Sequence, residues 1–190
     1  MDPHVVKNDK NMFYNFLNNA SVYFEYGSGG STYQASIRDN INKIYSVESD
    51  THWQDLLKIK INKNNINFIF NEMDTRPRDW GNPGPNATLA QRLNYSSHLG
   101  KLSEEEQKSI DFMLIDGRFR VACCLKAHAL ISDKCLIAFD DFLNRRHYHS
   151  VLDYYDILQH TQDKSMVILR KKRNTSVPED VIKRFENIHG

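Results

Sequence analysis

Five short apolar runs, separated by segments of helical length, constrain the fold of this chain more than any other feature. They lie at residues 22–25, 44–47, 66–70, 112–115 and 135–139. Each run is mostly apolar at successive positions, as in strands that are buried on both faces of a parallel sheet. Strands that alternate with helices imply βαβ units. The sequence therefore predicts an open α/β sandwich around a largely parallel sheet.

Segments of helical length fill the spaces between these runs, and two further apolar runs follow the fifth. Caps and periodicity predict helices over residues 9–18, 31–39, 52–61, 118–130 and 178–185. The last two runs, residues 155–160 and 165–169, are separated only by residues 161–164. This spacing suits an antiparallel hairpin better than a crossover helix. We therefore expect the sheet to end in an antiparallel C-terminal hairpin.

Length and charge limit the kinds of protein that this chain can be. Its 190 residues, 40% of them hydrophobic, suffice for one core and predict a single domain over residues 1–190. The 25 basic and 24 acidic side chains leave a net charge of +1, so no overall field draws the chain to nucleic acid. No apolar run reaches the roughly 18 to 20 residues that span a bilayer, and the first residues are polar, unlike a signal peptide. We expect a cytoplasmic protein whose partner is chosen by a local site.

Residues 74–100 differ from the rest of the chain. They hold three of its five prolines, Pro77, Pro83 and Pro85, and are predicted to be a long loop without regular structure. Such a loop is commonly a lid or a binding loop, and disorder is the alternative. Trp80 lies in this stretch, and we take it as a candidate contact with a substrate.

A glycine turn follows the first predicted strand directly and precedes a predicted helix. At Gly27, Gly29 and Gly30 the absence of side chains lets backbone N–H groups approach a ligand. A P-loop would need a lysine before the final Ser or Thr, and this turn has none. The dinucleotide fingerprint needs a third small residue where Thr32 stands. That mismatch weakens the interpretation as a dinucleotide site and leaves it open.

Two glutamates flank the turn and narrow the choice of ligand. Glu48 ends the second predicted strand about 20 residues past the turn, the spacing at which an acidic side chain accepts hydrogen bonds from ribose hydroxyls. Glu25 ends the first strand, where a carboxylate disfavours a pyrophosphate and suits a cationic ligand with an amino group and a sulfonium. This charge argument favours S-adenosylmethionine. The candidate cofactor contacts are Glu25, Gly27, Ser28, Gly29, Ser31, Glu48 and Ser49.

Three segments resemble the class I S-adenosylmethionine-dependent methyltransferases. Residues 25–30 (Glu-Tyr-Gly-Ser-Gly-Gly) look like their first motif and residues 47–50 (Val-Glu-Ser-Asp) like their second. Residues 111–122 (Asp-Phe-Met-Leu-Ile-Asp-Gly-Arg-Phe-Arg-Val-Ala) are similar to a fourth-strand motif of some bacterial members. The resemblance covers most of the chain. It implies a Rossmann-like three-layer sandwich with a seven-stranded sheet, a reversed last strand, and a cofactor across the ends of the first two strands.

Three aspartates follow the fourth and fifth predicted strands, where ligands of open α/β sheets bind. Asp116, Asp140 and Asp141 together would bind a divalent cation through oxygen, and without a cation they would repel one another. The pattern is similar to metal-dependent O-methyltransferases, including macrolide-sugar O-methyltransferases, and that resemblance implies Mg²⁺ at these three residues. The alternative is that they are helix-cap and turn residues.

Basic side chains are predicted near the same strand ends. They are Arg118, Arg120, Arg145, Arg146, His147 and His149. His147 is the candidate general base because the pKa of histidine lies near neutrality. With Arg118 and Arg145 as substrate contacts, the group suits a phosphate-bearing or polyhydroxylated acceptor, and a solvated surface cluster is the alternative.

The predicted function is therefore an O-methyltransferase that moves a methyl group from S-adenosylmethionine to a hydroxyl of a sugar, nucleotide sugar or glycan. Its candidate catalytic residues are Asp116, Asp140, Asp141 and His147. Two alternatives stay open: an NAD-dependent oxidoreductase of Rossmann type, and a binding module that keeps the fold without catalysis.

Overall fold

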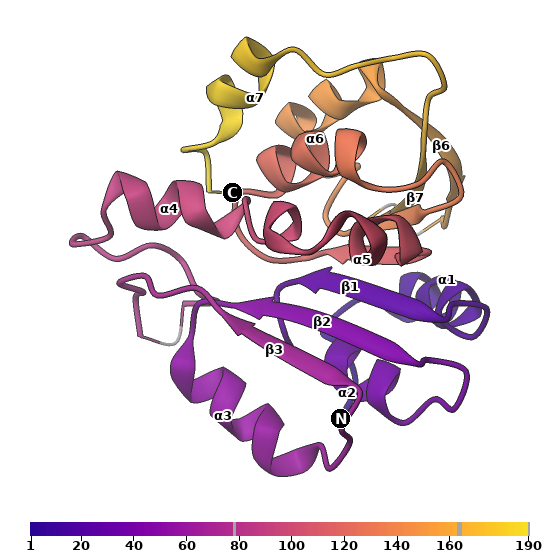
Figure 1. Cartoon of the computed structure of the whole chain (residues 1–190), viewed down its shortest axis with the longest axis vertical. Helices are drawn as coiled ribbons and strands as arrows, with labels where there is room; N and C mark the ends of the chain where they lie inside the picture. Colours follow the sequence, from indigo (N-terminus) through magenta and orange to yellow (C-terminus); the bar gives the residue numbers. More distant parts are fainter. Residues whose placement is uncertain (78, 163–164, 190) are drawn as a thin grey trace.

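A seven-stranded sheet with helices on both faces forms the centre of the protein (Figure 1). The computed structural model describes residues 1–77, 79–162 and 165–189. Along the sheet the strands follow the order β3-β2-β1-β4-β5-β7-β6. Their bounds are β1 (Val22–Tyr26), β2 (Lys43–Glu48), β3 (Ile66–Phe70), β4 (Phe112–Ile115), β5 (Leu136–Phe139), β6 (Tyr155–His160) and β7 (Val167–Lys171). The predicted Rossmann-like, three-layer α/β class is confirmed.

The first five strands run parallel, and the last two reverse. β1 pairs in parallel with β2 on one side and with β4 on the other, while β7 pairs antiparallel with both β5 and β6. The predicted C-terminal hairpin is therefore confirmed, although Asp163 and Lys164 of its predicted turn lie outside the described residues. Because the strand order reverses between β1 and β4, their carboxyl ends open the crevice in which such sheets bind ligands.

Helices cover both faces of the sheet, and among the described residues four of them, over residues 89–95, 99–101, 104–109 and 146–153, were not expected from the sequence. The helices are α1 (Lys7–Leu17), α2 (Gly30–Ser36), α3 (Thr51–Lys60), α4 (Leu89–Tyr95), η1 (Leu99–Lys101), α5 (Glu104–Ser109), α6 (Arg120–Leu130), η2 (Arg146–Asp153) and α7 (Glu179–Phe185). The expectation that residues 74–100 lack regular structure is wrong, because they contain α4 and η1. Capping boxes at Thr88 and Ser103 start α4 and α5, and their spacing to Gln91 and Glu106 is visible in the sequence.

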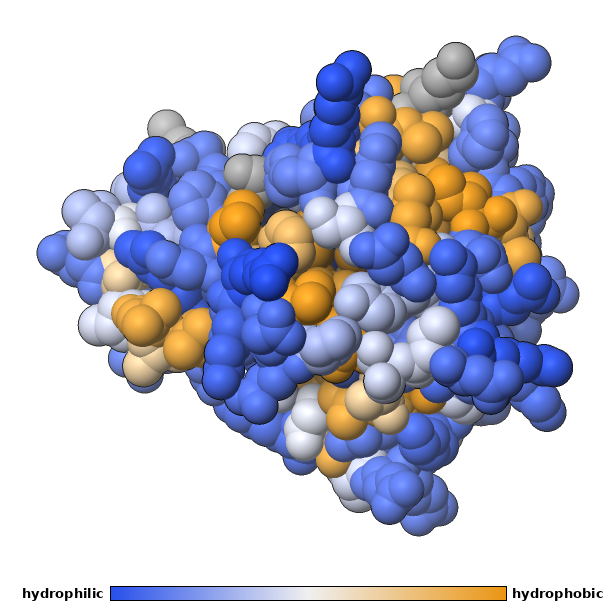
Figure 2. Space-filling model, turned by 90° about the horizontal axis from the view of Figure 1, so that it is seen from above, coloured by the Kyte–Doolittle hydropathy of each residue, from blue (hydrophilic) through white to orange (hydrophobic). Residues whose placement is uncertain are grey.

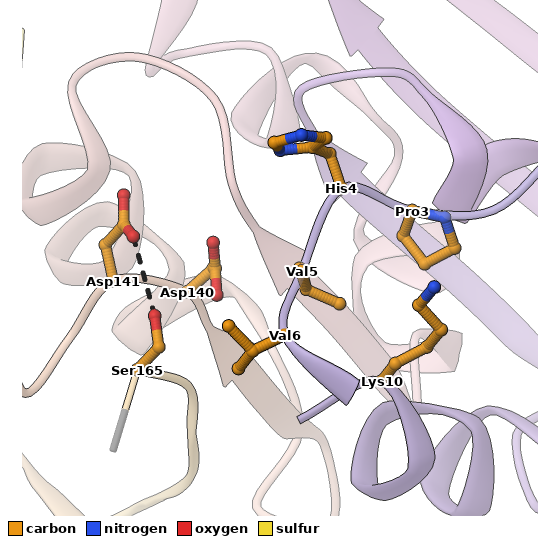
Figure 3. A pocket seen from close by; sticks show the side chains of 8 residues that line it. All are labelled: Pro3, His4, Val5, Val6, Lys10, Asp140, Asp141 and Ser165. Atoms are coloured by element: carbon orange, nitrogen blue, oxygen red, sulfur yellow. Dashed lines mark hydrogen bonds between the residues drawn. The ribbon is translucent and has the colours of Figure 1, made fainter. Parts of the chain in front are cut away.

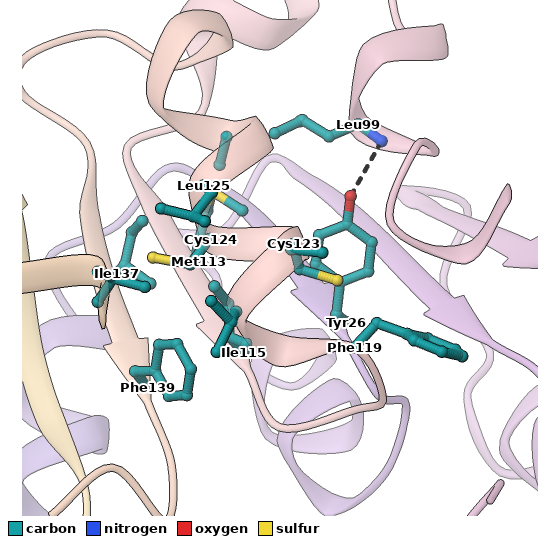
Figure 4. Close-up of a cluster of buried hydrophobic side chains, with 14 of the residues drawn as sticks. Tyr26, Leu99, Met113, Ile115, Phe119, Cys123, Cys124, Leu125, Ile137 and Phe139 are labelled. Carbon is teal, nitrogen blue, oxygen red and sulfur yellow. Dashed lines mark hydrogen bonds between the residues drawn. The ribbon is translucent and has the colours of Figure 1, made fainter. Parts of the chain in front are cut away.

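Alternating side chains of the strands build a core on each face of the sheet. From β4, Met113 and Ile115 join the larger core, whereas Phe112 and Leu114 join the smaller one under α1. Figure 4 shows part of the larger core, where the Tyr26 hydroxyl accepts from the backbone N–H of Leu99 at 3.3 Å. The ends of β1 and β4 are thus held between two packed layers, which fixes the crevice between them.

The outer surface is mostly polar on the face seen from above. Figure 2 shows hydrophilic residues over most of this face, with hydrophobic residues gathered in separate areas. Within the described residues, no helix has the length and apolar character needed to cross a membrane.

Candidate functional site

Two glycines bring the turns after β1 and β4 into backbone contact. Gly27 has a φ of +95°, and a Cβ at this position would lie 2.7 Å from the backbone nitrogen of Gly117. A Cβ on Gly117 would in turn lie 2.1 Å from the Tyr95 hydroxyl. Any larger residue would have to separate the two turns or distort the backbone. The two glycines therefore allow the turns after β1 and β4 to pack directly against each other.

Glu25 at the end of β1 is fully buried and surrounded by hydroxyl groups. Tyr23 donates to it at 2.8 Å, Ser31 and Ser46 each donate at 2.6 Å, and the Thr32 hydroxyl donates as well. Burial raises the pKa of Glu25, and these hydroxyl donors oppose the rise. All of these partners lie within the chain, so Glu25 ties the start of α2 to β1 and β2. Its contact with a cofactor amino group stays a prediction.

Thr32 has a structural role that the sequence analysis did not foresee. It was noted there only as the residue that breaks the dinucleotide fingerprint. In the structure its hydroxyl accepts from the backbone N–H of Gly29 at 2.8 Å and donates to Glu25. The signal in the sequence is the pair of hydroxyl residues, Ser31 and Thr32, that follows a buried acidic strand end. Such donors are what a buried carboxylate requires.

Glu48 at the end of β2 connects that strand to the glycine turn. It accepts backbone N–H groups from Ser28 at 3.1 Å, Ser49 at 2.7 Å and Asp50 at 2.9 Å. Burial nevertheless raises the pKa of Glu48 to about 7. A carboxyl group that titrates near neutrality beside a glycine turn can accept hydrogen bonds from ligand hydroxyls once it is ionised.

The surroundings of Glu48 fit a polar ligand such as the ribose of S-adenosylmethionine. The hydroxyl of Ser49 is buried and has no hydrogen-bond partner. Gly81 lies opposite with a φ of +70°, and a Cβ there would come within 3.1 Å of this hydroxyl and 3.5 Å of Glu48 Oε1. A hydroxyl without a partner next to a carboxyl group, both facing a residue without a side chain, suits a ligand that carries hydroxyls.

The structure brings Asp116, Asp140 and Asp141 together, as predicted, around the guanidinium of Arg120. Arg120 is the first residue of α6 and is 4% exposed. Its Nη2 lies 3.0 Å from Asp116 Oδ1, and its Nη1 lies 3.4 Å from Asp141 Oδ2 and 3.9 Å from Asp140 Oδ2. Burial disfavours its charge, but Asp116 and the neighbouring acidic groups outweigh this effect and raise its pKa.

The expectation of Mg²⁺ at these aspartates is not supported. Across residues 1–77, 79–162 and 165–189, no group of three or more His, Cys, Asp or Glu side chains is arranged to hold a metal ion. Arg120 supplies the positive charge that the three carboxylates need. The sequence analysis grouped Arg120 with the other basic side chains and overlooked that it lies only four residues after Asp116, across the short turn between β4 and α6.

Asp140 and Asp141 differ in their surroundings although they are adjacent. Burial, followed by the neighbouring Asp116, raises the pKa of Asp140 to about 8. Its Oδ1 is buried and has no hydrogen-bond partner. Asp141 instead pairs with Arg145 at 2.9 Å and has a φ of +60°, a conformation that costs a non-glycine residue on the order of 1–3 kcal/mol. Asp140 is therefore the member of the trio that has an unused acceptor atom.

An open cavity of about 420 Å³ lies beside this pair. Figure 3 shows residues 3–6 of the N-terminal segment across from Asp140, Asp141 and Ser165. The remaining lining residue is Lys10. No sequence pattern indicated that the N-terminus would reach this place. Its position depends on Gly30, because a Cβ there would lie 2.1 Å from the backbone of Asp2.

The other candidate residues lie around this centre with partners of their own. Arg118 donates to Asn82 Oδ1 at 2.8 Å, and the ring of the exposed Trp80 lies 5.2 Å from that of His4 in a tilted arrangement. His147 is exposed and is not among the residues that line the cavity; its ring lies 4.4 Å from that of Tyr148. Its role as a general base stays a prediction.

Comparison of sequences does not place the chain in a family. No protein-family model matches it, and no curated protein matches its sequence.

Solved structures resemble the chain over most of its length. A methyltransferase-like protein from Silicibacter pomeroyi has a TM-score of 0.76 and 24% identity, covering 97% of this chain and 95% of that one. An O-methyltransferase from Bacillus cereus in complex with SAH has a TM-score of 0.55 and 13% identity, covering 89% and 83%. A tRNA methyltransferase from B. subtilis has a TM-score of 0.52 and 13% identity, covering 88% and 67%. The chain has the fold of the class I S-adenosylmethionine-dependent methyltransferases.

Proposed function

We propose that this protein transfers a methyl group from S-adenosylmethionine to a hydroxyl oxygen of a small polyhydroxylated acceptor, such as a sugar, nucleotide sugar or glycan unit. One observation carries the proposal. At the crevice between β1 and β4, Glu48 and the glycine turn lie on one side, and on the other lies Asp140, with an unused carboxyl oxygen beside an open cavity. Such a crevice is where ligands of this fold meet.

The cofactor side is assigned to the ends of β1 and β2. When bound, S-adenosylmethionine supplies an electrophilic methyl group. Glu48 and the unpartnered Ser49 hydroxyl would hold the ribose, and the turn at Gly27 and Gly29 would let the backbone approach the rest of the molecule. Glu25 would act indirectly by holding the turn in place through its hydroxyl partners.

The acceptor side is assigned to the cavity beside Asp140. Its volume of about 420 Å³ falls within the range of small-molecule sites. The carboxylate of Asp140 would accept the proton of the acceptor hydroxyl as that oxygen takes the methyl group, whose bond to the sulfonium sulfur breaks and leaves a neutral thioether. Its raised pKa makes it a stronger base than a solvated aspartate.

A small acceptor suits this site better than a nucleic acid. The chain carries a net charge of +1, and Asp140 and Asp141 line the cavity. Among its described lining residues, the cavity lacks the clusters of Lys and Arg along a surface on which the binding of a long phosphate backbone depends. Because one structural neighbour is a tRNA methyltransferase, RNA belongs in the panel of acceptors to be assayed.

Calorimetry tests the cofactor assignment first. We expect the wild type to bind S-adenosylmethionine in preference to NAD, and Glu48→Ala to weaken that binding at least tenfold, about 1.4 kcal/mol. Glu179→Ala, an exposed glutamate of α7, is the matched control and should bind like the wild type. Equal affinity of Glu48→Ala and the wild type would remove the ribose assignment, and a preference for NAD would favour the oxidoreductase.

An assay of methyl transfer to panels of sugars, nucleotide sugars and RNA tests the acceptor assignment. We expect Asp140→Asn to lose turnover while its affinity for S-adenosylmethionine stays unchanged, because Asp140 lies on the acceptor side. Turnover equal to that of the wild type would refute Asp140 as the base. Cofactor binding without turnover on any acceptor would support a non-catalytic binding module.

A further inference from the structure

We infer that Arg120 is a positioning residue that does the work of a metal ion in this site: its guanidinium gathers three carboxylates and orients Asp140 toward the acceptor cavity. The role toward the acceptor rests on the proposed function. The contacts of Arg120 stand without it.

The hydrogen bonds of Arg120 hold its guanidinium in one orientation. Nε donates to the carbonyl of Gly117 at 2.9 Å, and Nη1 donates to the carbonyl of Asp140 at 2.8 Å. Nη2 faces Asp116 Oδ1 at 3.0 Å, and the Tyr148 ring lies 6.0 Å from the guanidinium carbon. A planar, buried guanidinium fixed at each of its nitrogens cannot leave the cluster without exposing several unpaired groups.

The placement of Arg120 in α6 depends on the three carboxylates. A helix N-terminus carries a partial positive charge and favours anions, so a buried arginine at the first position needs acidic partners. The preceding Phe119 is fully buried and has a φ of +55°, a strained conformation at the turn that leads into the helix. The local strain and the buried cation occur together at the end of β4.

The cation also determines which carboxyl oxygen remains available. Asp141 is taken by Arg145 and Arg120, and Asp116 faces Arg120 at close range. Asp140 Oδ2 lies 3.9 Å from Arg120, whereas its Oδ1 has no partner. Because Arg120 also holds the backbone carbonyl of Asp140, it fixes the side chain that faces the cavity. A divalent cation added to this cluster would be repelled by the guanidinium.

Binding of Mn²⁺ alone, followed by electron paramagnetic resonance, tests this inference without an acceptor. We expect the wild type to bind no Mn²⁺ at this site. Arg120→Ala should gain Mn²⁺ binding because its three carboxylates lose their cation. Adding Asp116→Asn to that variant should weaken the new binding at least tenfold. Arg184→Ala, which removes an exposed arginine of α7, is the matched control and should behave like the wild type.

Two further measurements keep the inference testable if Arg120→Ala does not fold. Arg120→Lys keeps the charge but not the planar fork, so it should bind no Mn²⁺ and should lower kcat while cofactor affinity is unchanged. EDTA should leave methyl transfer by the wild type unaffected.

Several results would overturn the inference. The first is that the wild type binds Mn²⁺ and that Asp140→Asn abolishes this binding. The second is that Arg120→Ala folds but binds no Mn²⁺. The third is that EDTA abolishes methyl transfer by the wild type, and the fourth is that Arg120→Lys keeps the kcat of the wild type. Failure of the wild type to bind S-adenosylmethionine would refute the proposed function instead and would leave the Mn²⁺ results as they stand.

Discussion

Both sides of the crevice contain acidic residues at strand ends, but the two sides stabilise these residues with different kinds of partner. At the ends of β1 and β2, Glu25 is surrounded by hydroxyls and Glu48 by backbone N–H groups, all of them neutral donors. At the ends of β4 and β5, the aspartates share the charge of Arg120. The neutral donors leave Glu48 with a pKa of about 7, whereas on the other side burial and the neighbouring Asp116 raise the pKa of Asp140 to about 8 although Arg120 opposes the rise. The two sides should therefore respond differently to pH and to mutation.

Removal of the cation should have the largest effect. Arg120→Met leaves the buried Asp140 and the half-buried Asp116 and Asp141 without their cation, and we expect a loss of about 3–5 kcal/mol in the free energy of unfolding. Urea denaturation measures it, with Arg184→Met on the surface of α7 as the control, which should stay within about 0.5 kcal/mol of the wild type. Adding Asp140→Asn to Arg120→Met should restore part of the loss. A single variant as stable as the wild type would show that the cluster does not depend on the cation.

The glycine contact that joins the two sides should come next. Gly27→Ala forces a side chain into a left-handed conformation and against the backbone of Gly117, so we expect a loss of about 1–3 kcal/mol and weaker cofactor binding. Gly100→Ala is the matched control, because its Cβ would meet only Leu130 at an ordinary 3.7 Å. Equal stability of the two variants in urea would contradict the tight contact between the turns.

The pH dependence of cofactor binding should separate the neutral-donor side from the ionic side. The pKa of Glu48 is raised to about 7 in the fold, so the protonated form is favoured and stability falls as pH rises from about 4.5 to 7. Ribose hydroxyls donate best to the ionised form. Affinity for S-adenosylmethionine should therefore rise with pH up to about 7, by up to about tenfold per unit.

Calorimetry from pH 5.5 to 8.5 measures this dependence. Glu48→Gln should flatten the curve, and Glu179→Gln should leave it unchanged. A wild-type curve that is already flat would mean that Glu48 does not titrate on binding.

The smallest effect should be at His147. Its side chain is exposed and lies outside the cavity, so His147→Ala should change the free energy of unfolding by less than about 0.5 kcal/mol. Its effect on kcat should also be smaller than that of Asp140→Asn. Measuring both variants on one acceptor decides between the two candidate bases, and a larger loss at His147 would return it to the centre of the mechanism.

Much of the fold could be predicted from local patterns. The apolar runs marked all seven strands, and the short spacing between residues 155–160 and 165–169 indicated the hairpin. The helix α4 was missed although its capping box at Thr88 was visible, because the prolines before it dominated the interpretation of that stretch. The capping box was a sufficient local signal for α4, and the neighbouring prolines do not prevent a helix that begins after them.

The candidate site was predictable in part. Its acidic residues follow strands, and strand ends gather at one edge of a parallel sheet, so the meeting of Asp116 and Asp140 could be expected from the order of elements alone. The cavity wall at residues 3–6 could not be expected, because it forms only where the N-terminal segment crosses Gly30.

The sequence by itself determined the strands, the glycine turn and the acidic residues at the ends of β1, β2, β4 and β5, because these depend on neighbours along the chain. Only the tertiary structure decided how each carboxyl group is stabilised: hydroxyls from α2 and β2 around Glu25, and the guanidinium of Arg120 among three aspartates. The physical reason is that the charge and solvation of a buried group depend on atoms within a few ångströms, and packing brings those atoms from separate elements.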